Sequence, residues 1–253
     1  LFYFIIICLT VFLTSFLKNA SIALTSMLGV WIIWTIFLPN ILKSSVEKIS
    51  ELPTRSVFIQ AMKDDRAKGI DGHNPSDERA LKLEAQILTE YGVDSLSQLP
   101  INFDGIRMQA DEEYGNIVWD KHFGNLREIY AHQKVSYQLL GVFNPFMSLQ
   151  NSSMGFAGTD NFHHQEFLVQ IENYRRVLIK SLNDQHANGG SKTGDWSLEP
   201  DSDFYKSVPD FQFKMIPLDV TFSKYIIDLL MLIIWALLAS LLLVLGTKKA
   251  KLL

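Results

Sequence analysis

The sequence predicts an all-α membrane protein in which a transmembrane helical hairpin and a final transmembrane helix flank a mainly α-helical inserted domain. Charge is the first reason, because residues 1–38 contain no Asp or Glu and a single base, Lys18. The second reason is the apolar run at residues 225–246, where Asp228 is the one charged residue. The third is the helical spacing of apolar residues in the polar region between these runs.

We predict transmembrane helices at residues 1–17, 20–38 and 225–246. A bilayer core about 30 Å thick requires roughly 20 apolar residues in a helix. The last run exceeds this length, the middle run is adequate, and the first is slightly short. Lys18 and Asn19 are the polar pair between the first two runs, so we expect a tight turn there. The alternatives are one bent helix of about 38 residues and a buried hairpin in a soluble core.

The charges after the last span orient the chain. Lys248, Lys249 and Lys251 are accompanied by no acid, so the positive-inside tendency places the short basic tail, residues 247–253, in the cytoplasm. The inserted domain, residues 39–224, is then periplasmic or extracellular. The same topology places Leu1 outside, and the first methionine is Met27, so we expect further spans before Leu1.

The inserted domain is acidic and contains no cysteine. Residues 39–224 hold 26 acidic and 19 basic residues, a formal net charge of −7. This charge argues against nucleic acid as a partner. Cys8, the one cysteine, lies in the first apolar run, so the domain has neither a disulfide nor thiolate chemistry and must fold by packing.

Two helices of the inserted domain have clear signals. Residues 160 to about 183 carry one apolar stripe at steps of three and four. Another helix begins at Asn74, a predicted N-cap followed by Pro75 at the first helical position, and it stops at Gly92.

The remaining parts of the domain have weaker signals. A longer helical region covers about residues 104–140, with Gly115 and Gly124 as candidate interruptions. Residues 187–203 are rich in Gly, Ser, Asp and Asn, which predicts a mobile surface loop. Alternation of apolar and polar residues around Phe211 and Phe213 is the one convincing strand signal.

The segment at residues 143–156 is uncharged and apolar. Pro145 stops the preceding helix, and the segment is either core packing or a short helix at the membrane interface. The candidate interface residues are Phe143, Phe146, Met147 and Leu149.

Two groups of polar residues are candidate sites. Asp160, His163 and His164 crowd a helix start, where they are either weak candidates for metal ligands or an N-cap with interfacial histidines. Asp228, near one end of its span, is a candidate intramembrane functional residue; it can instead reach the headgroups or pair locally with Lys224.

No sequence motif indicates catalysis. The run Gly189 to Gly194 lacks the glycine directly before Lys192 that a nucleotide-binding loop requires. Hydrolase motifs such as Gly-x-Ser-x-Gly and His-Glu-x-x-His do not occur. We therefore expect a protein that is not an enzyme, with no cofactor and no assigned metal site in this chain.

Motifs in the second half of the inserted domain resemble a known family. These motifs are Asn144-Pro145-Phe146, Ala157-Gly158-Thr159-Asp160, His163-His164, Phe167, Glu172 and Tyr174-Arg175. They are similar to those of ABC-2-type permeases, the permease subunits of type-2 ABC exporters. The likeness is closer to the permeases for multicopper-enzyme maturation, of the nitrous-oxide-reductase type, which carry a large extracytoplasmic insertion of unknown function. It covers the whole chain in topology and about residues 140–180 in sequence pattern.

The resemblance implies the C-terminal half of a six-span permease in a bacterial cytoplasmic (inner) membrane. The insertion would form an extracytoplasmic cap or docking domain over the translocation path. ATP, with Mg, would be hydrolysed by a separate cytoplasmic ABC ATPase subunit. The other expected partners are a second permease subunit in a homo- or heterodimer, the lipid bilayer, and an extracytoplasmic partner protein.

A function of another class stays open. A membrane-anchored extracytoplasmic sensor or scaffold would bind a ligand or partner protein with the same inserted domain. It would be expected to continue into a cytoplasmic signalling module, whereas this sequence has residues 247–253 after the last span.

Overall fold

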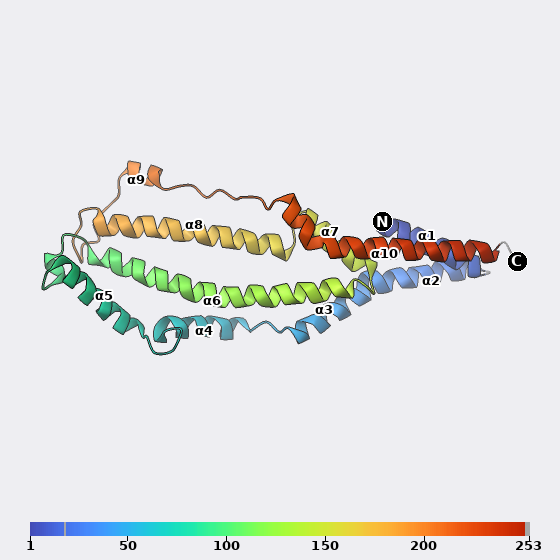
Figure 1. Ribbon diagram of the computed structural model, residues 1–253, viewed down its shortest axis with the longest axis horizontal. Coiled ribbons are helices and arrows are strands. Elements are labelled where there is room, and N and C mark those ends of the chain that lie inside the picture. Colours follow the sequence, from blue (N-terminus) through green and yellow to red (C-terminus); the bar gives the residue numbers. More distant parts are fainter. Residues whose placement is uncertain (18, 251–253) are drawn as a thin grey trace. The chain divides into compact units, whose positions relative to one another are not determined.

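The computed structural model describes residues 1–17 and 19–250, and of Lys249 and Ala250 only the backbone. Lys18 and Lys251, which helped to orient the chain, lie outside the described residues. All regular elements in the described part are helices, which confirms the all-α fold class (Figure 1). The chain divides into two compact units. Unit 1 comprises Leu1–Leu52, Ile129–Gln165 and the residues from Met215 onward, and unit 2 comprises Pro53–Glu128 and Glu166–Lys214.

Unit 1 contains the apolar helices. Helix α1 covers Phe2–Phe16, and the chain leaves it through an extended Leu17. Helix α2 (Ala20–Ile32), a π-helical turn η1 (Ile33–Phe37) and helix α3 (Leu38–Ile49) follow one another without a break, and helix α10 covers Leu218–Ala250. The extended Leu17 shows that one bent helix over residues 1–38, an alternative left open by the sequence, is wrong.

Two of these helices are long and apolar enough to cross a membrane by length and composition. They are Ala20–Ile49, with 30 residues, and Leu218–Lys248, with 31 residues. Both extend past the predicted boundaries, because residues 39–49 and 218–224 continue them as helix. Helix α1 has 15 residues, or about 22 Å of helix, so a span at residues 1–17 stays a prediction.

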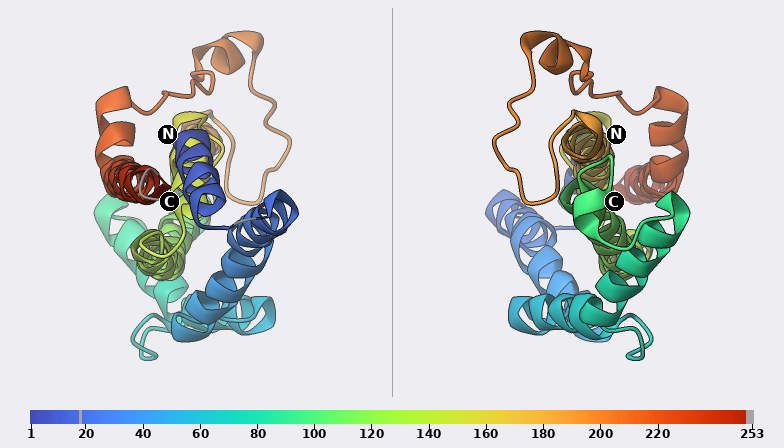
Figure 2. Two further views of the ribbon diagram at one scale, coloured as in Figure 1. Left: turned by 90° about the vertical axis from the view of Figure 1, so that its right-hand side faces the viewer. Right: turned by 90° about the vertical axis from the view of Figure 1, so that its left-hand side faces the viewer.

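The core of unit 1 lies where α1 and α7 (Pro145–Phe156) pack against α10. Figure 2 (left) shows α1, in dark blue, beside α10, in dark red. Small residues allow this approach, since a Cβ atom on Gly246 would lie 3.0 Å from the Phe12 ring. The buried core residues are Phe2, Ile5, Cys8, Trp34, Leu232, Ala236 and Ala239.

The π-helical turn leaves the carbonyl of Trp34 without a backbone donor among the described residues. The amide of Leu38 donates to an earlier carbonyl, and Pro39 has no amide hydrogen. The side-chain amide of Asn144, which is 0% exposed, donates to the Trp34 carbonyl at 2.8 Å. Its side-chain oxygen accepts the amide hydrogen of Phe146 at 3.0 Å and caps α7. A single side chain therefore joins the start of α7 to the π-helical turn.

Unit 2 is built from shorter helices and from parts of two long ones. Helix α5 stops at Gly92, as predicted, and Gly92 is left-handed, but the helix begins one residue later than expected, with Pro75 at the N-cap position. The elements are α4 (Arg55–Lys68), α5 (Ser76–Tyr91), the 3-10 turn η2 (Leu96–Gln98), α6 (Phe103–Leu140), α8 (Asn161–Asn188) and α9 (Ser202–Ser207).

Helix α6 is continuous over 38 residues. The prediction that Gly115 and Gly124 interrupt it is therefore wrong. A glycine inside a helix costs only about 1 kcal/mol relative to alanine, and packing along α6 outweighs that cost.

Helices α6 and α8 form an antiparallel pair in unit 2. Gly105, near the start of α6, meets Ala187, near the end of α8, and a Cβ atom on Gly105 would lie 2.5 Å from the amide nitrogen of Ala187. Further along, Arg176 of α8 makes a two-pronged ion pair with Asp120 of α6, at 2.7 and 3.0 Å. The close contact between the backbones at Gly105 and Ala187 explains why position 105 needs glycine.

Glu172 is the centre of an ion-pair network between these helices. Its carboxylate accepts hydrogen bonds from Arg175 at 2.9 and 3.0 Å and from Arg176 at 3.1 Å. Arg175 also reaches Glu112 of α6 at 2.9 Å. Burial raises the pKa of Glu172, but the hydrogen bonds and charges of both arginines more than offset this effect and hold the pKa below its ordinary value.

The Gly- and Ser-rich segment after α8 is anchored to the start of α6. The side-chain amide of Asn102, which is 0% exposed, donates to the hydroxyl of Ser191 at 3.0 Å. The amide of Gly194 donates to the carboxylate of Asp104 at 2.7 Å. Residues 189–201 are a loop, as predicted, and the part around Ser191 and Gly194 is hydrogen-bonded to the start of α6; its mobility stays a prediction.

The residues after α9 are extended along α8. The ring of Phe213 lies 5.7 Å from that of Phe167, and the side chain of Gln170 bonds both backbone groups of Lys214, at 2.8 and 2.9 Å. The alternation around Phe211 thus places aromatic residues against a helix. The predicted strand is wrong, because a helix rather than a second strand lies beside this segment.

Candidate functional site

Buried and partly buried polar side chains of unit 1 gather where α6, α7 and α8 meet the first turns of α10. We call this group the polar cluster. Its members are Lys134, Gln138, Asn151, Asp160, His163, Tyr225 and Asp228. Since they come from separate segments of the chain, the cluster exists only in the folded protein.

Asp228 is 0% exposed although it lies on an apolar helix. Its carboxylate oxygens accept hydrogen bonds from the side-chain amides of Gln138 at 2.6 Å and Asn151 at 3.0 Å. Gln138 also donates to the backbone carbonyl of Lys224 at 3.0 Å. Among the described residues, the side chains of Asp228 and Lys224 form no ion pair, so the expected local pair is wrong.

Asp160 connects α6, α8 and α10. Its carboxylate accepts hydrogen bonds from the hydroxyl of Tyr225 and from the ammonium of Lys134, the latter at 3.4 Å. It also accepts the backbone amide of His163 at 3.2 Å and contacts Nδ1 of the same histidine. This confirms the alternative in which Asp160 is the N-cap of its helix. Lys134 in turn donates to Tyr225 Oη at 2.6 Å.

Burial and neighbouring charges shift the pKa values of Asp160 and Lys134 in opposite directions. Burial raises the pKa of Asp160, but hydrogen bonds from His163 and the charge of Lys134 more than offset it, so the pKa lies below its ordinary value. Burial lowers the pKa of Lys134, and the attraction of Asp160 offsets only part of this effect. Lys134 and Asp160 therefore perturb each other at a site that excludes much of the water.

Two glycines allow the elements to meet. A Cβ atom on Gly155 of α7 would collide with the ring of Tyr225. Gly158 has a φ of 69°, in the left-handed region, where it reverses the chain between α7 and Asp160. The Ala157-Gly158-Thr159-Asp160 motif thus ends one helix and begins the next.

The candidate metal ligands do not come together. Asp160 and His163 are paired, whereas His164 is exposed on another face of α8. No three His, Cys, Asp or Glu side chains form a possible metal site anywhere in the described part of the chain. The ammonium of Lys134 already lies beside the Asp160 carboxylate and would repel a metal ion.

The candidate interface residues divide into two groups. Met147 is fully buried, and Phe146 and Leu149 pack against the core of unit 1. Phe143 is 65% exposed. Core packing therefore explains three of the four, and contact of Phe143 with a membrane interface stays a prediction.

Several members of the cluster were not identified in the sequence. Lys134 and Gln138 lie one turn apart on α6, as Tyr225 and Asp228 do on α10. These spacings are signals that place each pair on one helix face. They do not reveal the partner, because Gln138 and Asp228 are 90 residues apart.

The polar cluster links charged side chains to one another and attaches α10 to the other helices of unit 1. Lys134, Asp160, His163 and Tyr225 form one connected set of hydrogen-bonded and charged side chains. Together with Gln138 and Asn151 they attach the first turns of α10 to three other helices. Movement of α10 within unit 1 would have to break these bonds.

Comparison with known proteins identifies one family. The family model described as Domain of unknown function (DUF3526) matches residues 55–214, which is more than half of the chain. The match includes α4 to α9 and ends before α10. A search of the curated proteins found no match. A search of the solved structures also found none.

Proposed function

Since the chain belongs to the DUF3526 family, we propose that this domain is the extracytoplasmic part of a membrane permease subunit that works with an ATP-driven ABC exporter. The apolar helices would lie in a bacterial cytoplasmic membrane and form part of the translocation path. A separate cytoplasmic subunit would bind Mg and ATP and hydrolyse it. Two such permease subunits, identical or different, would complete the path.

The observation that carries the membrane part of the proposal is the exposed apolar surface of unit 1. Leu24 on α2 is 71% exposed, Leu237 on α10 is 66% exposed and Ile7 on α1 is 61% exposed. Large apolar side chains exposed in such numbers are unfavourable in water and favourable in lipid. A helix satisfies most of its own backbone hydrogen bonds, as a bilayer requires, and the Trp34 carbonyl at the π-helical turn is bonded by Asn144.

The polar cluster supports a moving part in α10. A buried carboxylate on a membrane-spanning helix is costly unless it is hydrogen-bonded, and it is commonly functional. Asp228 has two such bonds, both from outside α10. In a permease, breaking and remaking these bonds would link the position of the span to α6 and α7.

The resemblance to type-2 ABC exporters supports the transport part. Several of its motif residues have structural roles in unit 1: Asn144 caps α7 and binds the π-helical turn, and Asp160 and His163 belong to the polar cluster. These roles support a shared architecture with those permeases, including the insertion between the last two spans.

Copurification tests the transport proposal. The full-length protein, tagged and extracted from native membranes in mild detergent, should copurify with an ATPase subunit and stimulate its turnover several-fold. A variant of that ATPase without its catalytic carboxylate is the control for background hydrolysis. A stable complex that contains no nucleotide-binding subunit would refute the proposal and favour the sensor or scaffold alternative.

Single-cysteine labelling tests the topology separately. In a Cys8→Ser background, Ser97→Cys places a thiol on the exposed surface of unit 2, and Thr247→Cys places one at the end of α10. A membrane-impermeant maleimide on intact spheroplasts should label the first and not the second. Labelling of Thr247→Cys alone would show the opposite orientation.

A further inference from the structure

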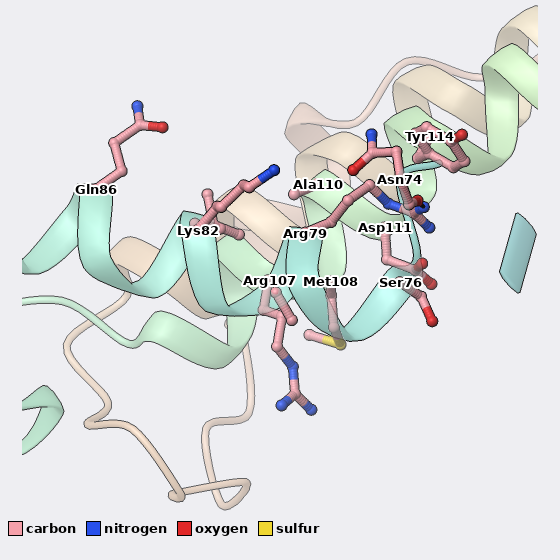
Figure 3. Close-up of a pocket in the computed structure, with 12 residues that line it drawn as sticks. Asn74, Ser76, Arg79, Lys82, Gln86, Arg107, Met108, Ala110, Asp111 and Tyr114 are labelled. Atoms are coloured by element: carbon pink, nitrogen blue, oxygen red, sulfur yellow. Dashed lines mark hydrogen bonds between the residues drawn. The ribbon is translucent and has the colours of Figure 1, made fainter. Parts of the chain in front are cut away.

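A cavity of about 590 Å³ lies in unit 2 between α5 and the first turns of α6 (Figure 3). Its volume is within the range of sites that bind small organic molecules. Ala80 of α5 and Ala110 of α6 are among its lining residues, and their short side chains leave space between the helices. Leu83, Met108 and the ring of Tyr114 provide further apolar lining.

The cavity carries unneutralised positive charge. Lys82 and Arg107 line it, both are exposed, and neither has an ion-pair partner in the described residues. In Figure 3 their side chains extend from different helices and in different directions. Lysine and arginine side chains are long enough to turn toward a bound anion.

Arg79 adds a fixed positive charge at the end of the cavity. Its guanidinium donates to the carbonyls of Asn74 and Arg66, the latter at 2.7 Å, and lies 3.7 Å from the centre of the Tyr114 ring. Carbonyls and an aromatic ring orient the guanidinium without cancelling its charge. Asp111, the acid of the lining, is already paired with Arg66 at 2.5 Å.

This local charge is opposite to that of the domain as a whole. Residues 39–224 carry 26 acids and 19 bases, yet three cations with no carboxylate partner in the described part of the chain border one cavity. We propose that this cavity binds an amphiphilic organic anion. Its apolar body would lie between α5 and α6, and its carboxylate or similar group would contact Arg79, Lys82 and Arg107. The proposal does not depend on the transport function.

Photoaffinity labelling of the full chain in nanodiscs tests it. The probe is a medium-chain alkyl carboxylate with a diazirine in its chain, and the matched control is the corresponding alcohol. Peptide mass spectrometry should find saturable adducts within residues 74–114 for the carboxylate, with at least about tenfold weaker labelling by the alcohol, as expected for loss of about 1.4 kcal/mol of charge-dependent binding. Equal labelling of these residues by both probes would overturn the proposal, as would adducts confined to the apolar helices.

Variants locate the charge contacts. Lys82→Gln with Arg107→Gln should weaken labelling by about tenfold or more. Arg55→Gln with Lys214→Gln removes the same charge from exposed positions outside the cavity and should leave labelling unchanged. Ala110→Trp, which fills the cavity, should abolish labelling while the circular dichroism spectrum stays that of the parent. Unchanged labelling of either cavity variant would refute the assignment.

Discussion

Replacing Asn144 with alanine should destabilise unit 1 by about 2–4 kcal/mol. The side chain makes a buried hydrogen bond to the Trp34 carbonyl at 2.8 Å and accepts a partly buried one from the Phe146 amide at 3.0 Å. Loss of the first leaves a buried carbonyl unsatisfied, which costs about 1–3 kcal/mol. Loss of the second removes a helix cap, which costs about 1 kcal/mol. The free energy of unfolding in mixed detergent micelles, followed by far-ultraviolet circular dichroism, measures the sum.

Asn144→Ser separates the two contributions. Serine is a good N-cap, but its hydroxyl is too short to reach the carbonyl that the asparagine amide binds. Asn144→Ser should therefore lose only the part due to Trp34, about 1–3 kcal/mol. A serine variant as stable as the parent protein would show that the carbonyl finds another donor.

Pro39→Ala tests why the Trp34 carbonyl accepts its hydrogen bond from Asn144. An alanine at this position has an amide hydrogen, which Pro39 lacks, and can donate it to the Trp34 carbonyl. In the Pro39→Ala background, Asn144→Ala should cost at least about 1 kcal/mol less than it does alone, a coupling typical of residues that share a partner. If the two changes are additive within about 0.5 kcal/mol, the explanation of the π-helical turn is wrong.

Three further predictions concern stability and local order. Gly155→Ala should lower the unfolding free energy and the melting temperature, because the new Cβ atom collides with the Tyr225 ring. Gly124→Ala is the control: a Cβ atom there has nothing within 4 Å, so this variant should be neutral or stabilising by up to about 1 kcal/mol. Equal effects of the two variants would contradict the close packing of Gly155. The pKa of Glu172 is lowered in the folded protein. Its stabilising contribution is therefore fully present above the unfolded pKa of about 4.3 and is lost as the pH falls through the lower folded pKa. Urea midpoints of the parent protein should fall more steeply in this pH range than those of Glu172→Gln, and parallel profiles would refute this. Asn102→Ala should free the segment around Ser191, and faster hydrogen exchange there than in the parent protein is the expected result; unchanged exchange would show that the other contacts suffice.

Much of the helical architecture could be predicted from residue patterns because local spacing determines it. The apolar stripe after Asp160, the helix stop at Gly92 and the break near Asn19 all depend on residues within a few positions of one another. Helix ends were less predictable. Hydropathy locates the apolar part of a span, whereas residues 218–224 are amphipathic and still helical, so α10 begins before the apolar run does.

The candidate site could be predicted only in part. Asp228 is conspicuous as an acid in an apolar run, and Asp160 as an N-cap. Gln138 is unremarkable in sequence, because many exposed helix positions carry glutamine. Its importance comes from a partner brought near by folding, and no local spacing contains that information.

The π-helical turn also fixes the direction in which α3 faces. A helix rotates by about 100° per residue and rises about 1.5 Å, and a π-helical turn accommodates one residue more than an α-helical turn. Deleting one residue from Ile33–Phe37 would therefore leave an ordinary α-helical turn, shorten the helix only slightly and keep α3 facing nearly the same way relative to α2. Val46, which is 5% exposed, would keep its buried position. The wide turn thus takes up one additional residue locally, and the residues after it stay on the faces that they would have in a regular α-helix.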